Sequence, residues 1–165
     1  MTTRKRSSER AGKPALKNTY SQSTRIFEDI QKTLRTHKAR SVTLDYGGNE
    51  RIEAISFALD VQGPTLRIRL PARYENVERI FERQKGRRLN EAERDQAYRT
   101  AWANIRDWLA AQMALVDTEM VEVAEIFLPY IIDQSGTTYF EALKERQFLL
   151  EAPHPTQQSI EEVKE

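Results

Sequence analysis

Three short runs of alternating apolar residues, all between residues 42 and 70, limit the folds open to this chain more than any other feature. Gly47-Gly48-Asn49 separates the first run from the second, and Gly63-Pro64 separates the second from the third. A period of two is typical of strands that bury one face, and turn residues between such runs indicate antiparallel pairing. The sequence therefore predicts a three-stranded antiparallel β-meander.

The second run changes phase near its start. If the strand were regular, Ile52 would lie on the opposite face from Ile55 and the later apolar residues. One extra residue in the strand restores a common apolar face. We therefore expect a β-bulge near Glu53 to Ala54.

The register between the second and third strands follows from placing their apolar residues on one face. Leu59 is then expected opposite Ile68, and Gly63-Pro64 is left as a two-residue loop in which glycine accepts positive φ. The same register places Asp60 opposite Arg67 on the outer face. We expect an ion pair between these two side chains.

Apolar residues at helical spacing flank the predicted sheet. The pattern from Ser21 to Lys38, with Ser23 or Thr24 as the N-cap, predicts a first amphipathic helix. After the sheet, a short helix is expected to begin at a cap on Asn76 and to stop at Gly86.

A third helical pattern is unusually long. Asn90 and Glu93 resemble a capping box, and helical spacing continues from Glu91 to Leu128. As a single helix this segment would measure about 57 Å, which exceeds the width of a small domain. Either it breaks near Asp117-Thr118, or one end projects or pairs with another chain. A last helix is expected after a cap at Thr137.

These elements give the order α-β-β-β-α-α-α, an α+β domain in which helices cover one face of the sheet and one helix of the C-terminal half is long. The chain has 165 residues, of which 39% are hydrophobic, and this content is enough for a core. Residues 21–150 are expected to form the domain. A disordered basic arm at residues 1–20 and a flexible acidic tail at residues 151–165 are expected on either side.

The composition also bears on the compartment. The chain has no cysteine, so disulfides, Cys-ligated zinc and thiol nucleophiles are excluded. No stretch has the apolar core of a secretory signal or the roughly 20 apolar residues of a membrane span. We expect a cytoplasmic protein that does not enter a membrane.

The formal net charge of +1 conceals an uneven distribution. Up to Arg106 the chain has 23 basic and 13 acidic residues, and after it 3 basic and 12 acidic residues. The near-neutral sum is the cancellation of two charged regions. Because binding responds to the local potential, near neutrality does not exclude an anionic partner.

Three short motifs occur together in this order of elements. They are a strand that ends in Leu70-Pro71, a helix around Ala101-Trp102-Ala103-Asn104, and Phe127-Leu128-Pro129 followed by Ser135-Gly136-Thr137-Thr138. On these motifs, residues 26 to 143 resemble a family of small uncharacterised proteins of bacterial phages and prophages. The resemblance implies a mobile-element gene product in the cytoplasm of a bacterial host, and it implies no activity, catalytic residue or cofactor. Trp102 and Phe127 are expected to anchor the core.

No constellation in the sequence is typical of a catalytic or metal site. His37 ends the first helix, His154 lies between two prolines, and neither has a ligand neighbour at metal spacing. Asp45, Glu53 and Asp60 fall on predicted strands, but the next strand lacks the acidic residue and lysine of a Mg²⁺-dependent nuclease. We therefore predict no enzyme activity, no metal and no cofactor.

Arginine is concentrated in the middle of the chain. Eleven basic residues lie between Arg67 and Arg106, against six acidic ones. Guanidinium groups bind phosphate and stack on bases, and Tyr74 and Tyr98 offer further stacking. The alternative is that these are solvated helix-surface charges. The candidate nucleic-acid contacts are Arg4, Lys5, Arg6, Arg67, Arg69, Arg83, Lys85, Arg87 and Arg88.

Two functional hypotheses follow. The first is a non-enzymatic nucleic-acid-associated binding protein of a phage or mobile element, which contacts the phosphates of DNA or RNA through the Arg-rich surface. The second is a protein-interaction module, an accessory subunit or inhibitor of a host or phage complex. Its long helix, with Trp108 beside the apolar stripe, would contact a protein partner or a second copy of the chain.

Overall fold

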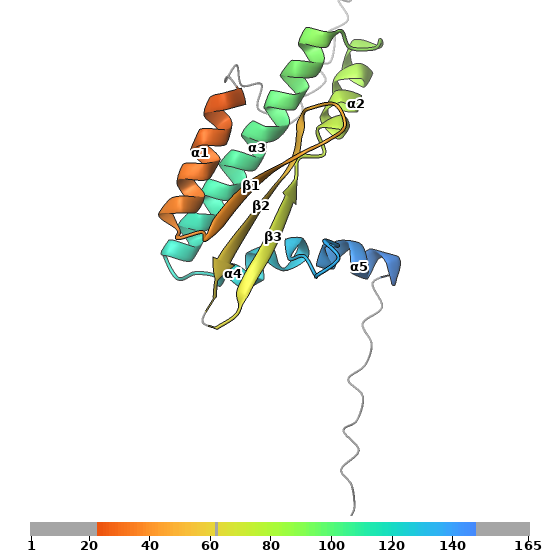
Figure 1. Cartoon of the computed structure of the whole chain (residues 1–165). Helices are drawn as coiled ribbons and strands as arrows, with labels where there is room; N and C mark the ends of the chain where they lie inside the picture. Colours follow the sequence, from red (N-terminus) through yellow and green to blue (C-terminus); the bar gives the residue numbers. More distant parts are fainter. Residues whose placement is uncertain (1–22, 62, 148–165) are drawn as a thin grey trace, which may run out of the picture.

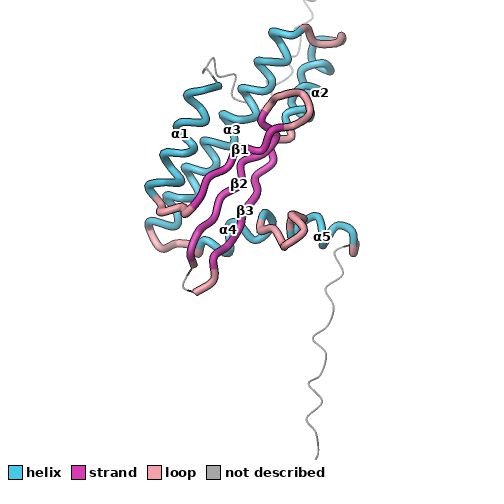
Figure 2. Tube along the Cα trace, viewed as in Figure 1, coloured by secondary structure: helices cyan, strands magenta, loops and turns pink. Residues whose placement is uncertain are grey.

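A three-stranded antiparallel sheet, in the order β1-β2-β3, lies against a layer of helices in the computed structural model (Figures 1 and 2). The structure describes residues 23–61 and 63–147, so the predicted arm and tail lie outside the described residues. The α+β class and the predicted order α-β-β-β-α-α-α are confirmed. The elements are α1 (Ser23–Thr36), β1 (Ser41–Tyr46), β2 (Ile52–Asp60), β3 (Thr65–Pro71), α2 (Tyr74–Lys85), α3 (Glu91–Asp117), α4 (Val123–Phe127), η1 (Leu128–Tyr130) and α5 (Tyr139–Glu145).

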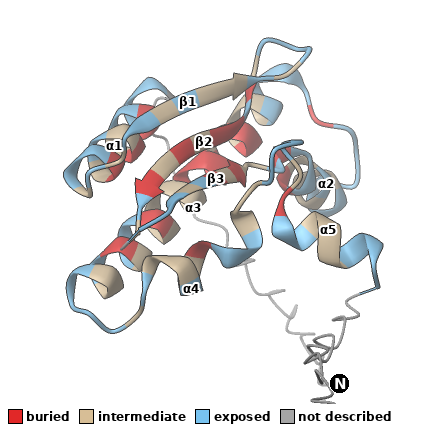
Figure 3. Cartoon of the chain, turned by 60° about the horizontal axis from the view of Figure 1, so that its bottom comes forward, coloured by how far each residue is buried: buried red, intermediate tan, exposed pale blue. Residues whose placement is uncertain are grey.

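The helical layer is built on α1 and α3, which lie side by side and run parallel (Figure 1). Arg106 of α3 lies 3.6 Å from Asp29 of α1. The buried residues are concentrated on β2 and β3 and on the helix surfaces that face them (Figure 3). Trp102 of α3 is fully buried at the centre of this layer, so its predicted role as a core anchor is confirmed.

The pairing of β1 with β2 contains one irregularity. The register shifts between Asp45 and Tyr46, which leaves Glu53 of β2 as an extra residue. Because of this residue, Ile52 and Ile55 are both buried in the core. The predicted β-bulge is confirmed.

The register between β2 and β3 differs from the prediction by two residues. Leu59 is opposite Leu66 rather than Ile68. Four residues rather than two therefore connect the paired ends of the strands, and the N–H of Val61 donates to the carbonyl of Pro64 at 3.0 Å. A shift of two residues keeps every side chain on its face, so the apolar pattern allowed both registers.

The predicted ion pair between Asp60 and Arg67 is wrong for the same reason. Asp60 is opposite Thr65, whose hydroxyl donates to the carboxylate at 2.6 Å, and Nε of Arg40 donates to it at 2.5 Å. The bond from Thr65, followed by that from Arg40, lowers the pKa of Asp60. Arg67 is opposite Ala58 instead.

The long helical pattern is divided between α3 and α4. α3 ends at Asp117, and the backbone turns at Glu119 with φ +54°. α4 then returns to the core, where the fully buried ring of Phe127 lies 5.5 Å from that of Phe57. Of the two outcomes that the sequence left open, the break near Asp117 is therefore the correct one, and Phe127 is the second predicted anchor to be confirmed.

Two predicted helix caps are wrong by one residue or more. α2 begins after Arg73, whose backbone has φ +45°, so Asn76 lies inside the first turn. α5 is capped by Thr138 rather than Thr137. The predicted end of α2 is confirmed, since Gly86 closes the helix with φ +65°, a conformation that glycine adopts readily.

The two edges of the sheet differ. Beyond β3, Ile131 pairs with Ile68, and the N–H of Ile132 donates to the carbonyl of Arg67 at 2.9 Å. Along the outer edge of β1, none of the described residues forms such a pair. The β3 edge is therefore covered, while β1 presents its backbone groups.

Candidate nucleic-acid interface

Arg67 and Arg69 lie on the face of the sheet that is turned away from the core. Nε of Arg69 donates to Oδ2 of Asp45 at 3.3 Å. Arg67 is exposed and donates to the backbone carbonyl of Asp133 at 2.8 Å. Both guanidinium groups already have an oxygen partner within the fold, with which a phosphate would have to compete.

The other described candidates gather at the turn from α2 to α3, residues 83–90, which we call the α2–α3 corner. Arg87 donates to both carboxylate oxygens of Glu93, at 2.9 and 2.8 Å, and Lys85 forms an ion pair with the same group. The predicted capping box is confirmed, and in it the N–H of Asn90 donates to Glu93 at 2.9 Å. Two predicted phosphate contacts therefore share one carboxylate that also caps α3.

Glu93→Gln should lower stability at neutral pH and change its acid dependence. The bonds from Arg87, then Lys85, then the Asn90 N–H hold the pKa of Glu93 far below its ordinary value of 4.5. Since the folded pKa is lowered, this stabilisation is complete above the ordinary pKa and is lost as the pH falls below it. Urea unfolding measures the free energy of unfolding of both proteins. The difference between wild type and variant should become smaller as the pH falls from about 5 to about 2.

Glu91→Gln is the matched control for this titration. Glu91 is exposed in the same helical turn and has no ion pair within residues 23–61 and 63–147. Its substitution should leave the acid dependence as in the wild type. A difference between Glu93→Gln and wild type that stays constant with pH would contradict the assigned contacts.

Arg83 and Arg88 differ from their neighbours at the corner. Both are exposed, and neither forms an ion pair with a residue that the structure describes. Leu89, the next residue along the chain, is buried and anchors the turn. The backbone of the corner is thus fixed while two guanidinium groups remain in solvent.

The structure does not bring the two groups of predicted contacts together. Figure 1 shows the α2–α3 corner at one end of the molecule, whereas β3 begins at the other end. Arg67 lies in the first half of that strand. The predicted surface is therefore two separate sites in the described part of the chain.

The N-terminal candidates Arg4, Lys5 and Arg6 lie outside the described residues. The chain enters the described fold at Ser23, and the next residue, Thr24, lines the same cavity as Asp95 and Arg99 near the start of α3. The point of entry is therefore at the same end of the molecule as the α2–α3 corner.

Tyr74 and Tyr98, which the sequence suggests as stacking platforms, are buried. The guanidinium carbon of Arg51 lies 5.3 Å from the ring centroid of Tyr98 and 6.0 Å from that of Tyr74. The hydroxyl of Tyr98 accepts the N–H of Ile52 at 3.1 Å, and burial raises its pKa. The two rings belong to the core and are not open to a base.

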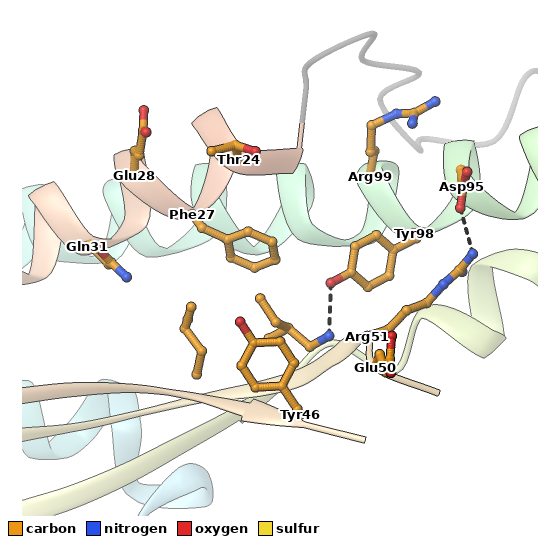
Figure 4. Close-up of a pocket in the computed structure, with 12 residues that line it drawn as sticks. Thr24, Phe27, Glu28, Gln31, Tyr46, Glu50, Arg51, Asp95, Tyr98 and Arg99 are labelled. Carbon is orange, nitrogen blue, oxygen red and sulfur yellow. Dashed lines mark hydrogen bonds and ion pairs between the residues drawn. The ribbon is translucent and has the colours of Figure 1, made fainter. Parts of the chain in front are cut away.

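Arg51 is the residue that the sequence analysis missed. Its Nη2 lies 2.6 Å from Oδ1 of Asp95 on α3 (Figure 4). Its Nη1 lies 3.7 Å from Oε1 of Glu78 on α2, so Arg51 joins the β1–β2 hairpin to both helices. No local pattern marks this arginine, because its partners are far along the chain. The contact becomes visible only in the folded molecule.

His37 makes structural contacts, and His154 lies outside the described residues. Nδ1 of His37 lies 2.7 Å from the carbonyl of Thr33, and Nε2 lies 3.1 Å from Asp117 at the end of α3. Among the described residues no cluster of three or more His, Asp and Glu side chains has the arrangement of a metal site. None of the described helices has the length and apolar character that crossing a bilayer requires.

Comparison with known proteins finds no match to this chain among family models, curated proteins or solved structures. The resemblance of its short motifs to a phage family stays a prediction. The function is therefore inferred from the geometry of the residues themselves.

Proposed function

We propose that this protein binds nucleic acid, without catalysing a reaction on it, through the α2–α3 corner. The observation that carries the proposal is the pair Arg83 and Arg88, two exposed cations without an ion pair among the described residues, on a turn anchored by Leu89. A cation that neutralises a phosphate releases a counterion, which favours binding. A turn that is already ordered loses little conformational freedom on binding.

The charge around the corner supports this choice. Residues 83–90 contain four cations and no carboxylate, and only Glu93 of α3 is paired with two of the cations. The described chain begins at this end of the molecule, so we include Arg4, Lys5 and Arg6, which lie outside the described residues, as further contacts in the proposal. Arg67 and Arg69 are secondary contacts in this proposal, because both are engaged within the fold.

The alternative, a protein-interaction module that uses the long helix, has less support. The helical pattern from Glu91 to Leu128 is divided between α3 and α4, so the excess length that suggested a partner is absent. Trp108 packs within the fold, with its ring 5.9 Å from Phe127 and 5.8 Å from Tyr130. We therefore place nucleic-acid binding first, in the setting of a phage or mobile-element protein in a bacterial cytoplasm.

Arg83→Gln with Arg88→Gln should weaken nucleic-acid binding and flatten its salt dependence. Fluorescence anisotropy with labelled single-stranded DNA, duplex DNA and RNA of about 20 nucleotides measures both, at about 50 and about 200 mM salt. Loss of two phosphate contacts should make the slope of log K against log salt shallower by about 1.4 to 1.8 units. At the lower salt we expect roughly tenfold weaker binding.

Lys32→Gln with Arg35→Gln is the matched control. These α1 residues are also exposed, lack an ion pair among the described residues, and carry the same charge. Their substitution should change affinity less than about twofold. Equal losses in both double variants, or wild-type binding weaker than about 1 mM at low salt, would exclude the corner as the binding site.

A further inference from the structure

A cavity of about 580 Å³ lies between α1 and the β1–β2 hairpin. Its apolar lining comes from Phe27 of α1, Leu44 of β1, Ile52 of β2 and Tyr98 of α3. The side chain of Tyr46, at the end of β1, is 66% exposed beside it. Figure 4 shows α1 and β1 as the two walls of this space. It has room for a large apolar side chain.

The wall formed by β1 is also the open edge of the sheet. Free N–H and C=O groups on an edge strand are a template for another strand, and proteins usually protect such edges with lysine, proline or a covering segment. β1 has the sequence Ser-Val-Thr-Leu-Asp-Tyr, with neither lysine nor proline. Its one charge, Asp45, accepts hydrogen bonds from Ser56 and Arg69. The cavity therefore lies beside an unprotected edge of the sheet, and we call the two together the groove.

The charges around the groove define what it accepts. Glu28 on α1 and Glu50 on the hairpin both line it, are exposed, and have no ion pair within the described residues. Arg51 is bound by Asp95, and Arg99 donates to the amide of Gln96 and points away from β1 (Figure 4). Two unpaired carboxylates favour a cationic occupant and disfavour a phosphate chain.

We propose that β1 accepts an extended basic segment of a partner protein as a fourth strand of the sheet. Main-chain hydrogen bonds to β1 supply affinity, and alternate side chains of the added strand supply specificity. One apolar side chain fills the cavity, and Lys or Arg side chains meet Glu28 and Glu50. This interaction goes beyond the proposed nucleic-acid function and uses none of the residues of the α2–α3 corner.

Selection from a displayed library of random peptides of about 12 residues, with the full chain as bait, tests the proposal. The recovered peptides should have one large apolar residue flanked by Lys or Arg and should lack proline at the centre. Hydrogen exchange of the complex should show slower exchange of amides in β1. Synthetic copies of the peptides should bind with Kd below about 100 µM.

Charge reversal then tests whether the peptide binds in the groove beside Glu28 and Glu50. Glu28→Lys with Glu50→Lys should weaken binding at least about tenfold, and Tyr46→Ala should weaken it independently of charge. The matched control is Glu119→Lys with Glu145→Lys, which reverses two exposed carboxylates that lack an ion pair among the described residues. It should change affinity less than about twofold. All of these positions are exposed, so circular dichroism should show a folded protein in each case.

Several outcomes would overturn the proposal. They are recovery of no binder, peptides that bind the Glu28→Lys, Glu50→Lys variant as well as wild type, and peptides that leave exchange in β1 unchanged. Self-association of the protein that Tyr46→Ala abolishes would assign the edge to a second copy of the chain. If single-stranded DNA still displaces the peptides from the Arg83→Gln, Arg88→Gln variant, the groove would be assigned to nucleic acid instead.

Discussion

Trp102→Ala is expected to lower the free energy of unfolding by about 3–5 kcal/mol. The indole is fully buried, and its ring centroid lies 5.0 Å from that of Phe27 on α1 and 6.5 Å from that of Tyr98 on α3. Its Nε1 is buried and no described residue meets the geometry of a hydrogen bond to it, so the expected loss comes chiefly from packing. Such a loss is a large part of the roughly 5–15 kcal/mol that stabilises a typical domain.

Urea unfolding followed by circular dichroism measures this loss. Tyr46→Ala is the control, because it removes an aromatic side chain that is 66% exposed, and we expect a change within about 0.5 kcal/mol. A loss below about 1 kcal/mol for Trp102→Ala would mean that the indole does not hold α1 against α3.

Phe127→Ala should cost a similar amount, about 3–5 kcal/mol, and should act locally first. The ring is fully buried between Phe57 of β2, at 5.5 Å, and Trp108 of α3, at 5.9 Å. It is the anchor that returns the chain to the core after α3. Because Ile131 covers the edge of β3, release of this segment should also uncover that edge.

Native-state hydrogen exchange tests the local effect. In Phe127→Ala, amides of α4, of α5 and of Ile131, which pairs with β3, should exchange faster than in the wild type. Amides of β2 and α3 should change less. Leu128→Ala, at the next position, removes a side chain that is 48% exposed and should leave exchange nearly unchanged. Uniformly faster exchange over all elements would show that Phe127 supports the whole core rather than the C-terminal segment.

The β-bulge was predictable because it interrupts the alternation of apolar and polar residues in the sequence. Ile52 breaks the alternation that Ile55 continues, and only an extra residue places both in the core. The capping box of Asn90 and Glu93 was predictable for a similar reason, since a spacing of three is written in the sequence. Each feature depends on residues that are close together along the chain.

The register of β3 was not predictable in the same way. Shifting the pairing by two residues leaves the apolar and polar faces unchanged, so Leu59 can be opposite Ile68 or Leu66 with the same alternation. The connection between the strands decides between the two registers. It includes Val61, whose N–H donates to the carbonyl of Pro64. The predicted pairing assigned Val61 to the strand and therefore made the loop too short.

The candidate site shows the same division. Charge counting found the arginines of the α2–α3 corner, but it does not show that Arg87 and Lys85 share Glu93 while Arg83 and Arg88 stay unpaired in the described structure. That distinction depends on how the turn brings α2 to the first turn of α3. Arg51 could not be found by composition, because its role arises from contacts between three elements.

The loop at residues 61–64 gives a practical means of orienting the molecule on a surface. It joins β2 to β3 at the end of the sheet that lies away from the α2–α3 corner (Figure 1). Gly63 and Pro64 are exposed, and exposed loop tips accept insertions better than strands do. A biotin-acceptor peptide between them would hold the protein on a sensor chip with the corner towards the solution, so long DNA could approach without steric interference from the support.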